Sequence, residues 1–140
     1  MSGRDDEYVL HPIGYVRSAL RDPASAPMQG SEGAPDAWID VDPALAPALL
    51  GVAAGDALVV VTWLHRADRG VLRVHPRDDP RRPLTGVFAT RSQDRPNPLG
   101  LHRVSVREVA GLRLRVGPLE AIDGTPVVDL KIALGGEADR

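Results

Sequence analysis

In TGVFATRSQDRPNPLGL (residues 85–101), an apolar run typical of a strand passes into a stiff polar loop. Proline fixes its own φ and moves the preceding residue out of the α region, so the two prolines of this loop hold Arg95 and Asn97 in extended geometry. The Asn97 amide offers two donors and one acceptor, and Arg91 and Arg95 bring planar guanidinium groups close to it in sequence. This combination suits recognition of a polar, partly anionic ligand.

The rest of the chain is predicted to be mainly β. Residues 56–65 are the best candidate for a buried strand, because they contain the longest apolar stretch of the chain, which includes β-branched side chains. Residues 103–109 and 112–116 alternate apolar and polar side chains around Ala110-Gly111, which predicts a hairpin. Short strands separated by frequent turns favour a closed or nearly closed sheet.

Shorter elements complete the predicted fold. Residues 9–15 show a weak period-two alternation of side chains that is typical of a strand. Residues 38–41 predict a short strand. Asp42-Pro43 predicts the start of one short helix that ends before the glycine at position 51. Residues 70–74 predict a strand that returns antiparallel to the buried one. Residues 21–36 form a loop long enough to carry function.

Composition fits one folded domain over residues 1–140. Hydrophobic residues make up 43% of the chain and aromatic residues only 4%, so the core is expected to consist of Val, Leu, Ile and Ala. There is no cysteine, which excludes disulfides, thiolate nucleophiles and cysteine metal sites. The four histidines lack the spacing of metal ligands, so we expect no metal site.

The sequence offers no membrane-spanning segment. Its longest apolar stretch, residues 57–64, is far shorter than the roughly 20 residues that a spanning helix needs. Residues 1–7 lack the cationic and apolar regions of a signal peptide. We therefore expect a cytoplasmic protein without a membrane partner.

The net charge of -2 is distributed unevenly. Residues 1–65 carry three Arg against nine acidic residues, whereas residues 66–115 carry twelve Arg against five. Because Arg binds phosphate and carboxylate through two parallel hydrogen bonds, this basic segment predicts an anionic partner such as RNA. A genome that prefers Arg codons would explain the choice of Arg over Lys, but it explains the clustering less well.

Residues 85–101 resemble the core motif of the TsaA-like (TrmO) family of S-adenosylmethionine-dependent tRNA methyltransferases, G-V-F-A-T-R-S-x-x-R-P-N-P-[IL]-G. Residues 12–18 and 123–131 supply supporting matches, and the resemblance extends from about Tyr8 to about Leu134. It implies a compact β-barrel with long functional loops, a homodimer, and methyl transfer to N6 of threonylcarbamoyladenosine 37 in tRNA. Longer members continue into a C-terminal domain, so the chain is similar to a short form.

The resemblance also implies the cofactor site, by position in the family's pattern. No Gly-x-Gly-x-x-Gly follows a strand, so S-adenosylmethionine must be bound by loops. From their chemistry, we expect Gln29 to contact the adenine edge, Asp123 to balance positive charge in the ligand, and Gly124 to permit close backbone approach. The implied cofactor-binding residues are Met28, Gln29, Gly30, His65, Arg66, Arg91, Leu101, Ile122, Asp123, Gly124 and Thr125.

The acceptor nitrogen is a weak nucleophile, because its lone pair is conjugated with the purine and the carbamoyl group. Positioning beside the sulfonium should supply most of the rate, aided by electrostatics or by a base. The candidates for a catalytic role are Asn97, Asp129 and Lys131, and the sequence does not choose among them. The predicted substrate-binding residues are Arg95, Asn97, Lys131, Arg81 and Arg82, the last two in an exposed loop.

The chain departs from the family pattern in places that leave the methyl acceptor open. Residues 56–59 are Asp-Ala-Leu-Val where the family usually has Ser-His-Leu-Trp, Arg66 stands where the family often has Gln, and residues 132–133 replace Pro-Tyr. Three functions are therefore compatible with the sequence. They are methylation of tRNA, methylation of a small molecule with the same cofactor, and nonenzymatic binding of the cofactor or a nucleotide.

Overall fold

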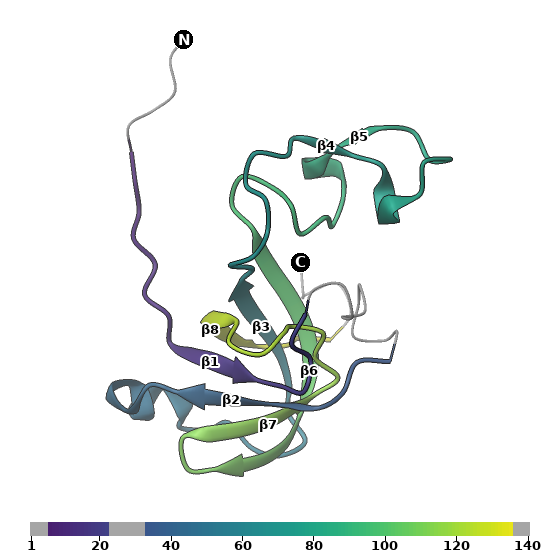
Figure 1. The fold of residues 1–140 in the computed structure, drawn as a ribbon. Coiled ribbons are helices and arrows are strands. Elements are labelled where there is room, and N and C mark those ends of the chain that lie inside the picture. Colours follow the sequence, from purple (N-terminus) through teal and green to yellow (C-terminus); the bar gives the residue numbers. More distant parts are fainter. Residues whose placement is uncertain (1–5, 23–32, 136–140) are drawn as a thin grey trace.

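The computed structural model describes residues 6–22 and 33–135, and its main body is a closed antiparallel β-barrel of six strands (Figure 1). The strands follow one another around the barrel in the order β1-β2-β7-β6-β3-β8, each antiparallel to its neighbours. The prediction of a mainly β, barrel-like fold is confirmed. The six strands are β1 (Gly14–Arg17), β2 (Ala37–Val41), β3 (Ala57–Trp63), β6 (Leu99–Ala110), β7 (Arg113–Gly117) and β8 (Pro126–Ile132).

Aliphatic side chains fill the barrel, as the composition predicts. Alternate residues of β3 and β2 point inward, including Leu58, Val60 and Ile39, and the three are almost completely buried. Val104 and Val106 of β6 belong to the same cluster. The hairpin of β6 and β7 also forms as predicted, since Ala110 pairs with Arg113 around a glycine whose φ is 64°.

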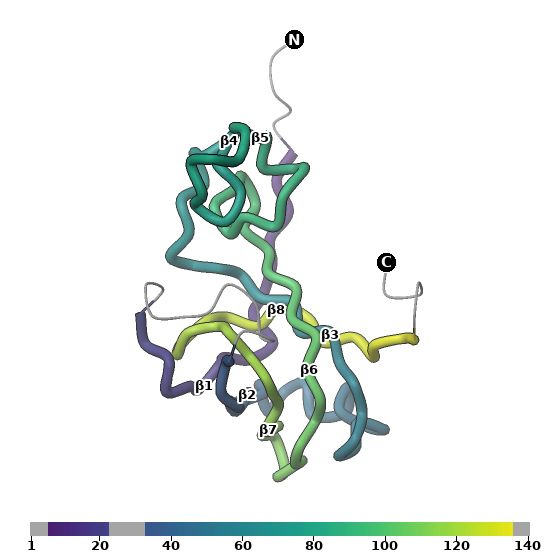
Figure 2. The backbone as a smooth tube through the Cα atoms, turned by 90° about the vertical axis from the view of Figure 1, so that its right-hand side faces the viewer, coloured from purple at the N-terminus to yellow at the C-terminus, as the bar shows by residue number. Residues whose placement is uncertain are grey.

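A small lobe, defined as residues 64–98, projects from the barrel between the end of β3 and the start of β6 (Figures 1 and 2). It contains a two-stranded sheet of β4 (Arg73–Val74) and β5 (Thr85–Gly86), with the short 3-10 helices η4 (Pro76–Asp78) and η5 (Val87–Ala89). The predicted pairing of residues 70–74 with the buried strand is wrong. Both edges of β3 are already taken by β6 and β8, so β4 pairs with β5 instead.

Two other predictions need correction. The first strand begins only at Gly14, because residues 6–12 extend away from the barrel without a neighbouring strand and Pro12 has no N–H to donate (Figure 1). The apolar run at the start of the motif forms η5 rather than a strand. The N–H of Thr90 donates to the carbonyl of Val87 at 3.1 Å, which closes a tight turn.

The predicted short helix is present as η3 (Pro43–Leu49), a 3-10 helix. The Asp42 carboxylate accepts a hydrogen bond from the N–H of Ala44 at 2.9 Å and so caps its first turn. Pro47 lies inside the helix and lacks a donor, which explains why this segment stays short. Among the described residues, no helix is long and apolar enough to cross a membrane.

An ion-pair cluster covers the outer face of β1, β2 and β7. The guanidinium Nε atoms of Arg113 and Arg17 donate to the two Asp40 oxygens at 2.8 and 3.1 Å, and Arg113 also lies over the Trp38 ring, 4.6 Å from its centroid. Partial burial raises the pKa of Asp40, but the hydrogen bonds from Arg113 and then Arg17 outweigh it and hold the pKa below its usual range. These arginines are thus compensated within the chain.

Antiparallel pairing around the barrel places three connections at one end, which we call the loop end. Because neighbouring strands are antiparallel, β1, β3 and β7 finish where β2, β6 and β8 begin. The connections at the loop end are residues 18–36, the lobe and residues 118–125. Any site built from the predicted loops must therefore lie there.

Candidate functional site

The predicted cofactor residues that the structure describes gather at the loop end. His65 and Arg66 follow β3, Arg91 lies in the rigid loop before β6, and residues 122–125 connect β7 to β8. Leu101 lies two residues inside β6. The predicted Met28, Gln29 and Gly30 lie outside the described residues. Segments that are far apart in sequence are therefore brought to one end of the barrel.

The outer face of β8, β3 and β6 brings three more predicted residues together. Val61 pairs with Leu101 on one side and with Asp129 on the other, and Val59 pairs in the same way with Lys131. Directly paired residues project from the same face of a sheet, so Leu101, Asp129 and Lys131 share this surface. The Lys131 ammonium lies 3.8 Å from the Asp129 carboxylate. Sequence alone does not reveal this neighbourhood, because it depends on strand register.

Arg95 supports the rigid loop from within. Its guanidinium donates to the carbonyl oxygens of Val87 at 3.0 Å, Ser92 at 2.9 Å and Thr90 at 3.2 Å. These bonds tie η5 to the Pro-Asn-Pro segment. A contact of Arg95 with substrate stays a prediction, but most of its donors already serve the loop.

A second set of bonds joins the rigid loop to the turn after β3. The N–H of Leu64 donates to the Pro98 carbonyl, and the N–H of Asp68 donates to an Asp94 oxygen, both at 2.8 Å. Arg69 reaches across to Asn97, with 3.1 Å between Nη2 and Oδ1. Sequence reasoning missed Arg69, because an arginine in a polar turn carries no signal of its partner.

Polar groups of the connection between β7 and β8 bond to one another and to the connection between β1 and β2. The Asp123 carboxylate accepts from the N–H of Ser18 at 3.0 Å and lies 3.5 Å from Nη1 of Arg21. Thr125 is buried, and its hydroxyl donates to the carbonyl of Ile122, which is also buried. Gly124 has a φ of 83°, and a Cβ there would meet open space. The positive φ by itself favours glycine at this position, and close approach of its backbone to the ligand stays a prediction.

A buried polar chain links β3, β6 and the connection that follows β7. His102 is 2.5 Å from Glu120 through Nδ1 and 2.7 Å from the Thr62 hydroxyl through Nε2. When the ring is neutral and Glu120 accepts from Nδ1–H, the Thr62 hydroxyl must donate to Nε2. A Cβ on Gly100 would lie 2.5 Å from Thr62 Oγ1 and 2.7 Å from His102 Nε2. The hydrogen bond between Thr62 and His102 thus explains why the motif ends in glycine at position 100. Sequence reasoning missed this polar network.

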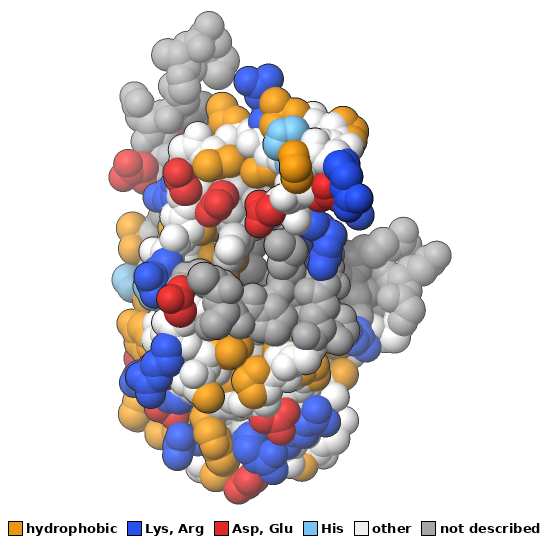
Figure 3. All heavy atoms as spheres, turned by 45° about the vertical axis from the view of Figure 1, so that its right-hand side comes forward, with side chains coloured by type: hydrophobic (Ala, Val, Ile, Leu, Met, Phe, Trp, Pro, Cys, Tyr) orange, Lys and Arg blue, Asp and Glu red, His pale blue; other side chains and the backbone are white. Residues whose placement is uncertain are grey.

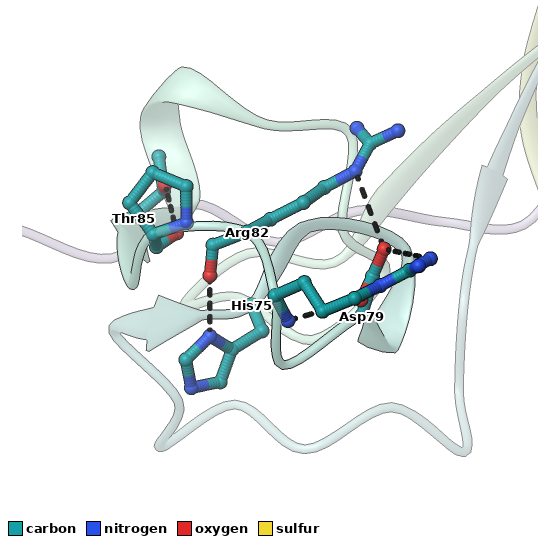
Figure 4. Close-up of polar contacts among 6 residues, drawn as sticks. His75, Asp79, Arg82 and Thr85 are labelled. Carbon is teal, nitrogen blue, oxygen red and sulfur yellow. Dashed lines mark hydrogen bonds and ion pairs between the residues drawn. The ribbon is translucent and has the colours of Figure 1, made fainter.

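The predicted Arg81 and Arg82 lie in the lobe between η4 and β5, and Figure 4 shows Arg82 beside Asp79. The Asp79 carboxylate accepts from Arg81 Nε at 3.0 Å and Nη2 at 3.1 Å, while Arg82 lies 3.9 Å away. The hydrogen bond from Arg81 lowers the pKa of Asp79, and Asp79 raises that of Arg81. His75 Nδ1 is 2.8 Å from the Arg82 carbonyl. Both arginine side chains remain largely exposed.

The described side chains on the face drawn in Figure 3 do not share one sign of charge. In Figure 3, basic side chains on the lobe and the lower barrel are interspersed with acidic and apolar ones. Two hollows on the barrel lie at the end opposite the loop end. One lies beside Gly14 and Asp42, and the other lies between Leu49 of η3 and Leu130 of β8. Among the described residues, no three metal-ligating side chains come together.

Comparison with known proteins gives one consistent result. The family described as the tRNA-methyltransferase O N-terminal domain matches residues 15–134. A probable S-adenosyl-L-methionine-binding protein of Methanothermobacter thermautotrophicus is 42% identical over 127 residues, which cover 91% of this chain and 90% of that protein. The S-adenosyl-L-methionine-binding protein of Archaeoglobus fulgidus is 38% identical over 123 residues, with 88% and 87% covered.

Solved structures show the same relationship. The crystal structure of TrmO from Pseudomonas aeruginosa superimposes with a TM-score of 0.74 at 26% identity and covers 92% of this chain. A second TrmO crystal structure, at 28% identity, also gives a TM-score of 0.74. The chain spans 57% and 58% of the length of these two solved chains.

Gly100→Ala should destabilise the fold by about 1–3 kcal/mol, because the new methyl group displaces Thr62 or His102 and breaks a buried hydrogen bond. The matched control is Gly86→Ala, where a Cβ meets nothing within 4 Å and φ is -63°. It should change stability by less than about 0.5 kcal/mol. Urea denaturation of the three proteins measures the difference. Equal stability of the two variants would contradict this account of the motif.

Proposed function

Because the chain belongs to the family of the tRNA-methyltransferase O N-terminal domain, we propose that it methylates N6 of threonylcarbamoyladenosine 37 in tRNA. The family resemblance found in the sequence is confirmed, and the cofactor is S-adenosylmethionine. The observation that carries the proposal is topological. The barrel gathers the intact motif loop, the turn at residues 65–66 and residues 122–125 at one end.

The cofactor supplies a methyl group on a sulfonium, and the chain supplies binding and orientation. Arg91 is exposed and has no ion-pair partner among the described residues, so it is available to an anionic group of the ligand. Of the three catalytic candidates, only the Asp129 carboxylate can accept a proton. The Asn97 amide is not basic, and a Lys ammonium has no lone pair. An Asp129→Asn variant with the full turnover rate would remove this assignment.

A second copy of the chain is the proposed partner at the loop end. Phe88 is 83% exposed and Leu72 64% exposed on the lobe, while Leu101 is 54% exposed on the barrel face below. Large apolar side chains left open on neighbouring elements mark an interaction surface. Most closed homo-oligomers of this kind are symmetric dimers. Light scattering that gives a monomer mass at micromolar concentration with cofactor present would contradict the dimer.

Methylation of a small molecule is the second candidate. Several arginines of the basic segment are compensated on the barrel, since Arg113 pairs with Asp40, and Arg115 and Arg107 pair with Asp36. This reduces the surface that remains for phosphate groups. The tRNA proposal therefore depends on the lobe arginines, and it also carries the expectation of a cytoplasmic location.

Arg91→Ala should weaken S-adenosylmethionine binding about tenfold or more, the loss of one charge-assisted contact. Arg113→Ala is the control, because it removes the same charge from the start of β7, at the end of the barrel opposite the loop end. Its affinity should stay within about twofold of wild type. Calorimetry measures both, with thermal unfolding in parallel. Unchanged affinity of the Arg91 variant removes that residue from the site.

Incubation with S-adenosylmethionine and threonylcarbamoylated tRNA should yield the methylated nucleoside, which mass spectrometry detects. Binding to this tRNA should weaken steeply as salt rises, because phosphate contacts release counterions. Replacing Arg81 and Arg82 together with Ala should flatten that slope and leave cofactor affinity unchanged. A protein that binds cofactor but neither binds nor methylates the modified tRNA would favour a small-molecule acceptor.

A further inference from the structure

Arg69 is held on three sides in the turn after β3. Its Nε donates to the Pro96 carbonyl at 2.6 Å, and its Nη2 donates to Oδ1 of Asn97 at 3.1 Å. Its Cζ lies 5.1 Å from the centroid of the Trp63 ring, within the range of a cation–π contact. Trp63 ends β3, so the guanidinium bridges the barrel wall and the rigid loop.

The turn that carries Arg69 is itself fixed to that loop. The N–H of Asp68 donates to an Asp94 oxygen, and the N–H of Gly70 donates to the Asp68 carboxylate, both at 2.8 Å. Arg69 therefore leaves its place only if several bonds break together. The position of its donors is a property of the fold.

These contacts determine which way the Asn97 amide faces. A guanidinium has only donors, so the group that Asn97 turns toward Arg69 must be its carbonyl oxygen. The amide nitrogen, with its two hydrogens, then faces away from Arg69. The backbone cannot rotate to turn the amide another way. Asn97 lies between two prolines, and its backbone carbonyl accepts from the N–H of Leu99 at 2.8 Å.

Asn97 is exposed and lies two residues before Leu99, at the start of the outer face that carries Leu101 and Asp129. Its amide nitrogen has no hydrogen-bond partner within residues 6–22 and 33–135, so it is a fixed donor beside that face. Arg69 uses its Nε and one Nη in hydrogen bonds to Pro96 and Asn97. This division makes Asn97 the ligand contact and Arg69 its support.

We propose that Arg69 is a positioning residue that fixes Asn97 as a hydrogen-bond donor to a carboxylate or carbonyl oxygen of the bound ligand. The inference rests on the proposed function and deepens it. The oxygen belongs either to the carboxylate of S-adenosylmethionine or to the threonylcarbamoyl group of the modified adenosine. Asn97 does not accept the N6 proton, because its only acceptor faces Arg69.

Asn97→Asp removes the proposed donor but keeps the hydrogen bond to Arg69 that supports the loop. The variant keeps the oxygen that Arg69 binds and replaces the amide nitrogen with a second, negatively charged oxygen. The melting temperature should stay equal to or above that of wild type, while affinity for the ligand that supplies the oxygen falls about tenfold or more. Gln93→Glu is the matched control, because it makes the same chemical change at another exposed amide of the loop. Its affinities should stay within about twofold of wild type.

Two pairs of probes identify the source of the oxygen. Calorimetry compares S-adenosylmethionine with 5′-methylthioadenosine, which lacks the carboxylate, and competition binding compares modified with unmodified anticodon stem-loop RNA. Loss of the preference for S-adenosylmethionine in Asn97→Asp assigns the cofactor carboxylate, and loss of the preference for modified RNA assigns the nucleoside. Unchanged preferences for both pairs, or an equal loss in Gln93→Glu, overturn the inference. Wild-type protein that binds neither cofactor nor modified RNA overturns the proposed function itself.

A double-mutant cycle tests whether Arg69 acts through Asn97. Arg69→Ala should weaken binding about tenfold in the wild-type background and should have no further effect in Asn97→Ala. Arg69→Lys should give an intermediate loss, because an ammonium cannot keep the fork geometry and the stacking on Trp63. Independent, additive losses from Arg69→Ala and Asn97→Ala would overturn the positioning role. Melting temperatures measured for each variant identify any loss that comes from unfolding.

Discussion

Closure of the six-stranded barrel is the constraint on which the rest of the structure depends. A closed antiparallel sheet has no free edge, so no further strand can pair with β3 or β6 within the barrel. The two short strands between β3 and β6 pair with each other instead, in the lobe. Every pair of neighbouring strands in the barrel is antiparallel, so the three connections that carry the site residues emerge together at the loop end.

The buried chain of Thr62, His102 and Glu120 joins that barrel to its loops. Polar groups that are removed from water cost free energy unless each finds a partner, and here each one does, since no buried side-chain nitrogen or oxygen in the described part of the chain lacks a hydrogen bond. These hydrogen bonds connect β3 and β6 to Glu120, in the same connection between β7 and β8 that holds Asp123. A well-satisfied polar network of this kind is rigid, so it holds the start of β6 and the loop after β7 in a fixed relation.

Local patterns in the sequence were enough to predict the hairpin at residues 103–116, the buried strand and the capped helix at Pro43. Each depends on side chains that alternate or on a turn within a few residues. The strand partner of residues 70–74 and the late start of β1 were not predictable in this way, because pairing depends on which edges the distant strands leave free. The same limit applies to the site. The motif loop is visible in the sequence, whereas Arg69 and the neighbourhood of Asp129 and Leu101 depend on contacts between segments far apart in the chain.

The polar residues of the motif loop fall into two groups: some hydrogen-bond within the protein and hold the loop, and others face outward toward a ligand. Arg95 donates hydrogen bonds to three carbonyl groups of the loop. Asp94 accepts a hydrogen bond from the N–H of Asp68 in the neighbouring turn. Arg91 and the Asn97 amide nitrogen are left to face outward. The arginine-rich composition thus has two physical roles, since a guanidinium that is fully bonded inside the protein adds rigidity but no attraction for a ligand. Net charge along the sequence therefore overstates the anion-binding surface, and recognition depends on the few donors that the folded loop leaves unused.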